Sequence, residues 1–240
     1  MTKQILQARI TRLEERGDRV FRLGLEADEA FVYEAGQYLE IQVTEDIWAP
    51  FSIASAPHQK ELELHIQYLP GREVSETLYQ KLIQGGTLTL RLATGECLLP
   101  KEEQPLVLVA GGTGFAQMKS LLEAAFERGW QAPLTLYWGA RNREGLYALD
   151  LARDWESNYS NFTLLPCVDL ADADWKGRNC SLVESLGMDY IDPDSASEVK
   201  GFCSGSPALV YAIEDLMMTR GMPPRSLLSD VHAYAPRNYD

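Results

Sequence analysis

The chain has 240 residues, of which 45% are hydrophobic, 10% aromatic and 24% charged. This composition is typical of a folded globular protein and excludes a disordered, collagen-like or disulfide-framework chain. With 22 Lys and Arg against 35 Asp and Glu, the formal net charge is -13. Such acidity disfavours binding to nucleic acid and to anionic membrane surfaces.

The N-terminal sequence predicts a cytoplasmic location. Residues 1–17 are charged from the start and contain no signal-peptide cleavage site. No apolar run in the sequence approaches the roughly 20 residues of a membrane span, so we expect no membrane insertion. Four cysteines (Cys97, Cys167, Cys180 and Cys203) and three histidines lie far apart in the chain, and their spacing predicts no metal site.

The first hundred residues show the alternation of half-buried antiparallel strands. Apolar and polar residues alternate over residues 19–23, 38–43, 61–68 and 87–92, with turn-forming residues between these stretches. One helix interrupts them: Ser75 is its predicted N-cap, it covers residues 76–83, and Gly85 and Gly86 end it. About six strands and one helix predict a small antiparallel six-stranded β-barrel over residues 1–101.

The hydrophobic period changes near residue 101, and strands and helices then alternate. Strands are predicted at 105–110, 134–138, 162–168 and 199–203, and helices at 115–128, 146–155 and 181–186. In the last predicted helix, Ser206 is the cap, Pro207 lies in the first turn and Gly221 is the end. This order predicts a second domain over residues 102–240, an α/β domain with a doubly wound parallel sheet. The short linker, residues 100–105, predicts that the two domains pack together.

Glycines follow the first strand of the predicted parallel sheet and open a helix, in the segment Ala110-Gly111-Gly112-Thr113-Gly114-Phe115. Glycines at this place let backbone N–H groups approach a phosphate, and a helix N-terminus favours negative charge. The segment is neither a Walker loop nor a full GxGxxG motif, and a purely structural turn is the alternative. Its position in the sheet favours nucleotide binding.

A second strand, turn and capped helix surround Cys203, in the segment from Gly201 to Pro207. One interpretation places Cys203 at the carboxyl edge of the sheet, facing a ligand. Another is a nucleophile elbow of a hydrolase, with Asp230 and His232 as its downstream acid and base; a buried inert cysteine is the third. The acid and base are two residues apart with one helix before them, which disfavours the hydrolase.

The barrel half contains the segment Pro50-Phe51-Ser52-Ile53-Ala54-Ser55. It is typical of a strand that begins with a proline. An aromatic ring beside two hydroxyls suits a flat heteroaromatic ligand, although barrel interiors also have this composition.

Together these segments resemble the ferredoxin–NADP reductase superfamily along almost the whole chain. Within it, the chain is most similar to the single-chain NAD(P)H:flavin oxidoreductases of the luciferase-associated type. The matching stretches occur in the family's order: residues 35–38 (AGQY), 50–55 (PFSIAS), 62–66 (LELHI), 111–114 (GGTG), 137–141 (YWGAR) and 203–207 (CSGSP).

The resemblance implies a role for each matching segment. Ser52 would be catalytic beside N5 of the flavin, and Cys203 would be catalytic beside the nicotinamide. Tyr234 falls where relatives carry a C-terminal aromatic residue near the flavin ring. The implied cofactor-binding residues are Pro50, Phe51, Ser52, Ile53, His65, Ile66, Gln67, Tyr68, Arg72, Ser75, Gly111, Gly112, Thr113, Gly114, Phe115, Arg141, Cys203, Gly205, Pro207 and Tyr234.

One residue departs from the family's flavin motif, because Ala49 stands where relatives carry a phosphate-binding arginine. Losing such a charge-assisted contact removes roughly 1.5–3 kcal/mol, or about 10- to 100-fold in affinity. Either flavin then exchanges freely as a substrate, or Arg72 and the Ser75 turn replace the arginine and FAD or FMN co-purifies. Arg141 and Arg143 suit a 2′-phosphate, so both NADH and NADPH are expected to bind; a solvated loop is the alternative.

The resemblance implies hydride transfer from NADH or NADPH to FAD, FMN or riboflavin, by a ping-pong or sequential mechanism. The expected partner is free flavin or a protein electron acceptor. One alternative is a reductase component that passes electrons to a separate ferredoxin or oxygenase, and another is a binding module without catalysis. The sequence makes no prediction of the oligomeric state, and it assigns no role to residues 235–240, for which disorder is one alternative.

Overall fold

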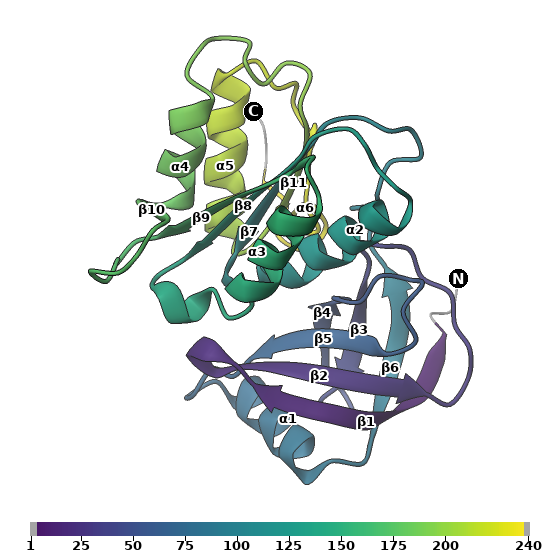
Figure 1. Cartoon of the computed structure of the whole chain (residues 1–240). Helices are drawn as coiled ribbons and strands as arrows, with labels where there is room; N and C mark the ends of the chain where they lie inside the picture. Colours follow the sequence, from purple (N-terminus) through teal and green to yellow (C-terminus); the bar gives the residue numbers. More distant parts are fainter. Residues whose placement is uncertain (1–3, 238–240) are drawn as a thin grey trace.

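The structure is a computed structural model that describes residues 4–237. Two six-stranded sheets form its two halves, an antiparallel sheet below and a parallel sheet above in Figure 1. The predicted architecture is therefore confirmed, and the predicted boundary between residues 101 and 102 falls between the last strand of the first sheet and the first strand of the second.

The antiparallel sheet has the strand order β4-β3-β6-β1-β2-β5. An isolated bridge between Ile53 and Leu64 joins its two edges and closes the sheet into a barrel. Alternate side chains point inward, and Leu39, Ile41 and Leu64 are fully buried. The elements are β1 (Ile5–Glu15), β2 (Val20–Ala27), β3 (Tyr38–Gln42), β4 (Trp48–Ser52), β5 (Leu62–Gln67), α1 (Glu73–Gln84) and β6 (Thr87–Thr94).

Helix α1 begins two residues before the position predicted for its N-cap. Arg72, in extended conformation, is the N-cap, and Ser75 lies inside the helix. The Ser75 hydroxyl instead accepts a hydrogen bond of 2.8 Å from the backbone N–H of Leu69. The prediction of Ser75 as N-cap was therefore wrong, because this hydroxyl binds the loop before the helix and not the N–H of its first turn.

The parallel sheet has the strand order β10-β9-β8-β7-β11-β12. Helices α2 and α3 cover the face toward the barrel, and α4 and α5 cover the other face (Figure 1). The sheet is thus doubly wound, as predicted. The elements are β7 (Leu106–Gly111), α2 (Phe115–Glu127), β8 (Leu134–Ala140), α3 (Leu149–Asn158), β9 (Phe162–Val168), β10 (Arg178–Asn179), α4 (Leu182–Asp189), β11 (Lys200–Ser204), α5 (Pro207–Thr219), β12 (Leu227–Leu228) and α6 (Val231–Tyr234).

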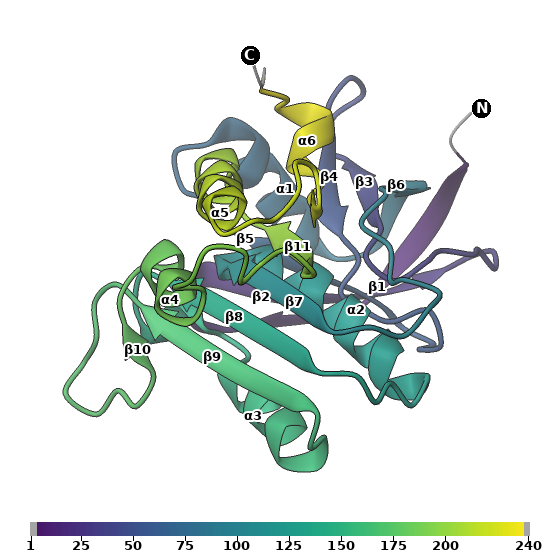
Figure 2. The same cartoon turned by 90° about the horizontal axis from the view of Figure 1, so that it is seen from above.

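The C-terminal segment continues past α5, the last helix predicted from the sequence. It adds the short strand β12 and the helical turn α6, which Figure 2 shows near β4 of the barrel. Residues 235–237 are also placed: Arg237 forms an ion pair with Asp215, and Ala235 accepts a hydrogen bond from Tyr211. Residues 238–240 of the tail lie outside the described residues. Among residues 4–237, no helix has the length and apolar character needed to cross a membrane.

Candidate functional site

Strands β7 and β11 are neighbours in the parallel sheet, and the chain leaves them in opposite directions. β7 continues into α2 on one face, and β11 continues into α5 on the other. This point, where the strand order reverses, is the usual ligand crevice of an open α/β sheet. The two turns that form it are Gly111–Gly114 and Ser204–Ser206.

The glycines of the first turn allow these two turns to approach closely. A Cβ atom on Gly114 would lie 2.1 Å from the carbonyl oxygen of Ser204, and one on Gly111 would lie 2.4 Å from Leu209. Gly112 differs, because it has a φ of +52° and no atom within 4 Å of where a Cβ would stand. Gly114 is therefore needed for the close approach of the two turns and Gly111 packs against the Leu209 side chain, while Gly112 leaves open space at the N-terminus of α2.

The barrel faces these turns across a cleft of about 410 Å³. The cleft is bordered on the barrel side by the end of β4 and by β5, and on the other side by both turns. It brings together ten of the twenty residues that the resemblance singled out. Its lining residues are Pro50, Phe51, Ser52, His65, Gln67, Leu69, Gly111, Gly112, Thr113, Gly114, Ala116, Ser204, Gly205 and Ser206.

A second lobe of about 280 Å³ adjoins this cleft. Pro50, Phe51, Ser52, Ser204 and Gly205 border both lobes and form the waist between them. The far wall of the second lobe consists of Tyr38, Glu40, Ser229, Asp230, Val231 and Tyr234. Tyr234 is 63% exposed, so its aromatic ring is available to cover a ligand in this lobe.

Four of the implied cofactor-binding residues have buried side chains and do not border either lobe. Ile53 and Ile66 belong to the barrel core, Phe115 stacks on Trp138 with 3.9 Å between ring centroids, and Cys203 is fully buried. Burial, with a smaller effect from Glu214, raises the pKa of the Cys203 thiol to about 12. A thiol in this environment is a poor nucleophile, which disfavours the hydrolase interpretation.

Five other implied residues lie outside the two lobes. Tyr68 stacks on Tyr79 with 4.4 Å between ring centroids, and Arg72 and Arg141 are exposed. Ser75 is occupied by the N–H of Leu69, and Pro207 is the first residue of α5.

The ring of His65 is held by two protein groups. Nε2 lies 2.7 Å from Oε1 of Glu63, and Nδ1 lies 2.7 Å from the hydroxyl of Tyr147. Burial lowers the pKa of His65 and outweighs the nearby carboxylate, so the ring is neutral. An ionised Glu63 can only accept, so Nε2–H donates to Glu63 and the Tyr147 hydroxyl donates to Nδ1. Because the side chain is fully buried, it is the main chain of His65 that borders the cleft.

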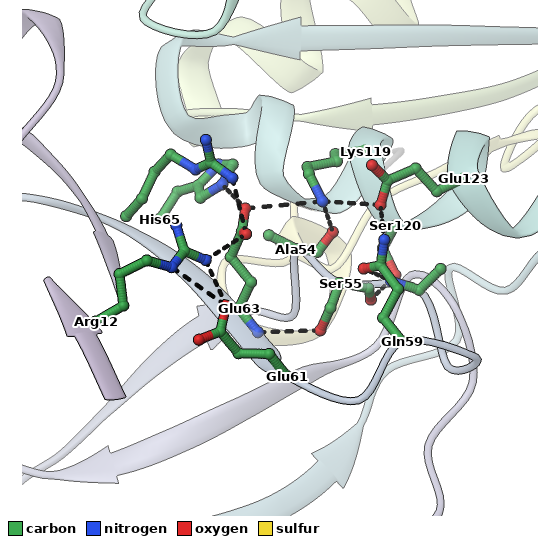
Figure 3. A network of polar contacts seen from close by, with 12 residues as sticks. Arg12, Ala54, Ser55, Gln59, Glu61, Glu63, His65, Lys119, Ser120 and Glu123 are labelled. Atoms are coloured by element: carbon green, nitrogen blue, oxygen red, sulfur yellow. Dashed lines mark hydrogen bonds and ion pairs between the residues drawn. The ribbon is translucent and has the colours of Figure 1, made fainter. Parts of the chain in front are cut away.

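Glu63 is the centre of a buried polar network between the domains (Figure 3). It accepts hydrogen bonds of 2.9 Å from both Arg12 and Arg22, and Lys119 of α2 lies 3.7 Å away. Burial alone would raise the pKa of Glu63, but the hydrogen bond from His65, the charge of Lys119 and the hydrogen bond from Arg22 hold it well below its ordinary value.

Glu63, Lys119 and Tyr147 were not predicted as site residues from the sequence. One signal was available: Lys119 follows Phe115 by one helical turn and therefore lies on the apolar face of the predicted helix. Gln117, on the same helix, was also missed. It donates hydrogen bonds of 2.7 Å to the Gly36 carbonyl and to Asp230, and so joins the barrel to the wall of the second lobe.

Comparisons with known proteins agree with this two-domain fold. Residues 5–117 match the FAD-binding domain, and residues 108–215 match the oxidoreductase NAD-binding domain. The sequence predicted FAD or FMN with NADH or NADPH, and these domains confirm FAD and a nicotinamide nucleotide.

Two relatives illustrate the sequence similarity. The NAD(P)H-flavin reductase of Vibrio harveyi is 31% identical over 192 residues, which cover 77% of this chain and 81% of that protein. The reductase component 2 of terephthalate 1,2-dioxygenase from a Comamonas species is 32% identical over 223 residues, or 92% of this chain. The chain spans 65% of the length of that reductase component.

Solved structures show the same fold. The cytochrome P450 reductase GcoB of Amycolatopsis superposes with a TM-score of 0.84 and 25% identity, covering 94% of this chain and 68% of that one. A ferredoxin NADP+ reductase from Neisseria gonorrhoeae, with bound FAD and NADP, gives a TM-score of 0.79 at 20% identity, covering 93% and 97%. The chain belongs to the ferredoxin–NADP reductase superfamily, within which NAD(P)H-flavin reductases are among its relatives.

Proposed function

We propose that the protein is an NAD(P)H:flavin oxidoreductase that transfers hydride from NADH or NADPH to FAD, FMN or riboflavin. The observation that carries this proposal is the waist of the cleft, where Phe51 and Ser52 of the flavin-type barrel face Ser204 and Gly205 of the nucleotide-type domain. Two ligands in adjoining lobes would meet only there. Holding two reactants in contact is the main task of a protein in such chemistry.

The residues present fit both ligands. Gly112, with open space beside it, and the N-terminus of α2 suit the pyrophosphate of a nicotinamide nucleotide. Phe51, the Ser52 hydroxyl and the exposed Tyr234 ring suit a flat isoalloxazine. Flavin, when bound, supplies a hydride-accepting N5 and can release electrons one or two at a time. Ser52 is the proposed catalytic hydroxyl beside N5.

Cys203 keeps its proposed place near the nicotinamide only through its main chain. Its thiol is buried in the core between β11 and α5, so its proposed contribution is to shape the strand end that precedes Ser204 and Gly205. The main chain of His65, with the side chain of Gln67, would border the ligand from β5.

The surroundings of the flavin phosphate favour free exchange of flavin. Ala49 is buried in the barrel core, so that position offers no charge to the cleft. The candidate replacement site at the start of α1 carries two carboxylates, Glu73 and Glu76, and Glu76 already accepts the N–H of Gly71. Carboxylates at a helix N-terminus repel a phosphate, so we propose that flavin is a substrate rather than a prosthetic group.

A second candidate function is a reductase component that passes electrons to a separate ferredoxin or oxygenase. It is favoured by the terephthalate dioxygenase reductase, which is similar over 92% of this chain. For either function we propose a cytoplasmic location.

An absorbance spectrum of the purified protein, followed by NADH and then excess FMN, tests the proposal. We expect a colourless protein that oxidises NADH only after FMN is added. Flavin bands that NADH bleaches would instead support a prosthetic flavin and a protein acceptor. Absence of NADH oxidation under both conditions would overturn both functions and leave the binding module.

A further inference from the structure

Helix α2 leaves the glycine turn and binds the barrel within its first two turns. The Lys119 ammonium donates a hydrogen bond of 3.2 Å to the carbonyl of Ala54, and the Ser120 hydroxyl donates one of 2.8 Å to the carbonyl of Ser55 (Figure 3). Lys119 also donates to Glu123 on its own helix, at 2.8 Å. We call the two contacts from Lys119 and Ser120 to the barrel main chain the α2 anchor.

The α2 anchor joins the two walls of the cleft close to the site. On the barrel side, Ala54 and Ser55 follow Ser52 by two and three residues. On the other side, Lys119 and Ser120 follow Gly114 by five and six residues, along a rigid helix. The distance from Ser52 to the glycine turn is therefore set by these hydrogen bonds, together with the one from Gln117 to the Gly36 carbonyl, rather than by the distant linker.

Attaching a helix through a buried ammonium group carries a large desolvation cost. The Lys119 side chain is only 4% exposed, and removing a charge from water costs several kcal/mol before its partners offset it. An apolar side chain would provide adhesion without this cost, whereas directed polar groups specify one arrangement. The carboxylate facing Lys119 is itself fixed: Glu63 is bound by Arg12, Arg22 and His65. These contacts therefore fix the position of helix α2 on the barrel rather than add to the stability of the fold.

We propose that Lys119 is a positioning residue for hydride transfer, which holds the glycine turn, and with it the nicotinamide, at a fixed distance from Ser52 and the flavin. The proposal rests on the proposed function. Hydride donor and acceptor react from about 3–3.5 Å, and a misplacement of about 1 Å can cost about 100-fold in rate. Releasing the α2 anchor should therefore slow the chemical step without removing either ligand site.

The test compares Lys119→Met with Lys176→Met, a matched change at an exposed lysine. Methionine keeps an unbranched chain of similar length and removes the charge. We expect single-turnover hydride transfer from NADH to FMN to fall at least tenfold in Lys119→Met, with the Kd values of NADH and FMN changed less than threefold. Lys119→Arg should recover most of the rate because it keeps the charge and the donors. The control should behave as wild type.

A second readout needs no ligand. Hydrogen exchange in residues 52–58 and in the first turns of α2 should be faster in Lys119→Met than in Lys176→Met, because the α2 anchor protects both segments. An unchanged hydride-transfer rate in Lys119→Met overturns the proposal, as does a rate loss matched by an equal loss of NADH affinity.

Ser120→Ala keeps the proposal testable if Lys119→Met does not fold, because it removes one hydrogen bond and uncovers no charge. We expect a rate loss of severalfold at constant NADH affinity, and a wild-type rate in this variant would also overturn the proposal. A wild-type protein that oxidises no NADH with any flavin would instead show that the proposed function itself is wrong.

Discussion

Replacing Gly114 by alanine is expected to force apart the two turns that form the nucleotide side of the cleft. The new methyl carbon would lie 2.1 Å from the Ser204 carbonyl oxygen and 2.6 Å from its carbon. The closest ordinary C···O contacts are about 3.3 Å, so one turn must move by about 1.2 Å. Both contacted atoms are main chain, and no change of rotamer relieves the overlap.

The magnitude follows from that displacement. Overpacking of this kind costs roughly 1–3 kcal/mol of unfolding free energy. A shift of about 1 Å at the turn also misplaces the nucleotide, for which we expect a loss of about 100-fold in kcat/KM for NADH. Urea unfolding measures the first quantity, and steady-state NADH oxidation with saturating FMN measures the second.

Gly187→Ala is the matched control, because it adds the same methyl group where space exists. Gly187 lies in helix α4, and its Cβ would meet only Leu216, at 4.0 Å. Alanine is the better helix former, so this variant should gain up to about 1 kcal/mol and keep its activity. A Gly114→Ala protein with wild-type stability and wild-type kcat/KM would refute the close approach of the two turns.

Three further predictions concern single groups of the site. Arg72→Ala should leave the Kd of FMN, measured by fluorescence quenching, within about twofold of wild type. Loss of a hydrogen bond to a charged group would instead weaken binding about 10-fold or more, and such a loss would show that Arg72 replaces the missing arginine. Ser52→Ala should slow hydride transfer about 2- to 10-fold in stopped flow, the value of one hydrogen bond, with NADH binding retained. The lowered pKa of His65 means that below about pH 6.5 the unfolded chain binds a proton that the folded chain does not. The unfolding free energy should therefore fall from pH 7 to pH 5, by at most about 1.4 kcal/mol per pH unit from this group. His65→Gln should reduce this dependence of the unfolding free energy on pH. An equal dependence in wild type and variant would contradict a buried neutral His65.

Local sequence patterns predicted the strands that are buried on one face or on both faces. The strand predicted at residues 162–168 coincides with β9 to the residue, and the alternation over residues 38–43 marks β3 to within one residue. Strand β1 was not predicted, although Leu6 and Ala8 alternate inward, because polar and charged residues such as Arg9 and Arg12 interrupt the alternation along its length. The cap of α1 was misplaced because Ser75 bonds to a loop that the sequence does not position.

Some site residues could likewise be predicted from the sequence and others could not. The glycine turn and the Phe51-Ser52 pair are contiguous motifs, and the structure places them on opposite sides of one cleft. Cys203 was correctly placed near the carboxyl end of β11, but a strand buried on both faces has no alternation to show which way a side chain points. Glu63 and Lys119 are far apart in sequence and come within 3.7 Å of each other only when the domains pack together. The sequence alone therefore did not indicate their interaction.

The shared waist of the two lobes has a consequence for how ligand preference can change. Phe51, Ser52, Ser204 and Gly205 border both spaces, so under the proposed function a substitution at any of them should alter the KM of donor and acceptor together. Independent adjustment is confined to the far walls, with Gln67 and Leu69 in one lobe and Tyr38 and Tyr234 in the other. Variants selected for a new acceptor with an unaltered nicotinamide donor should therefore accumulate changes beside Tyr38 and Tyr234 and leave the waist intact.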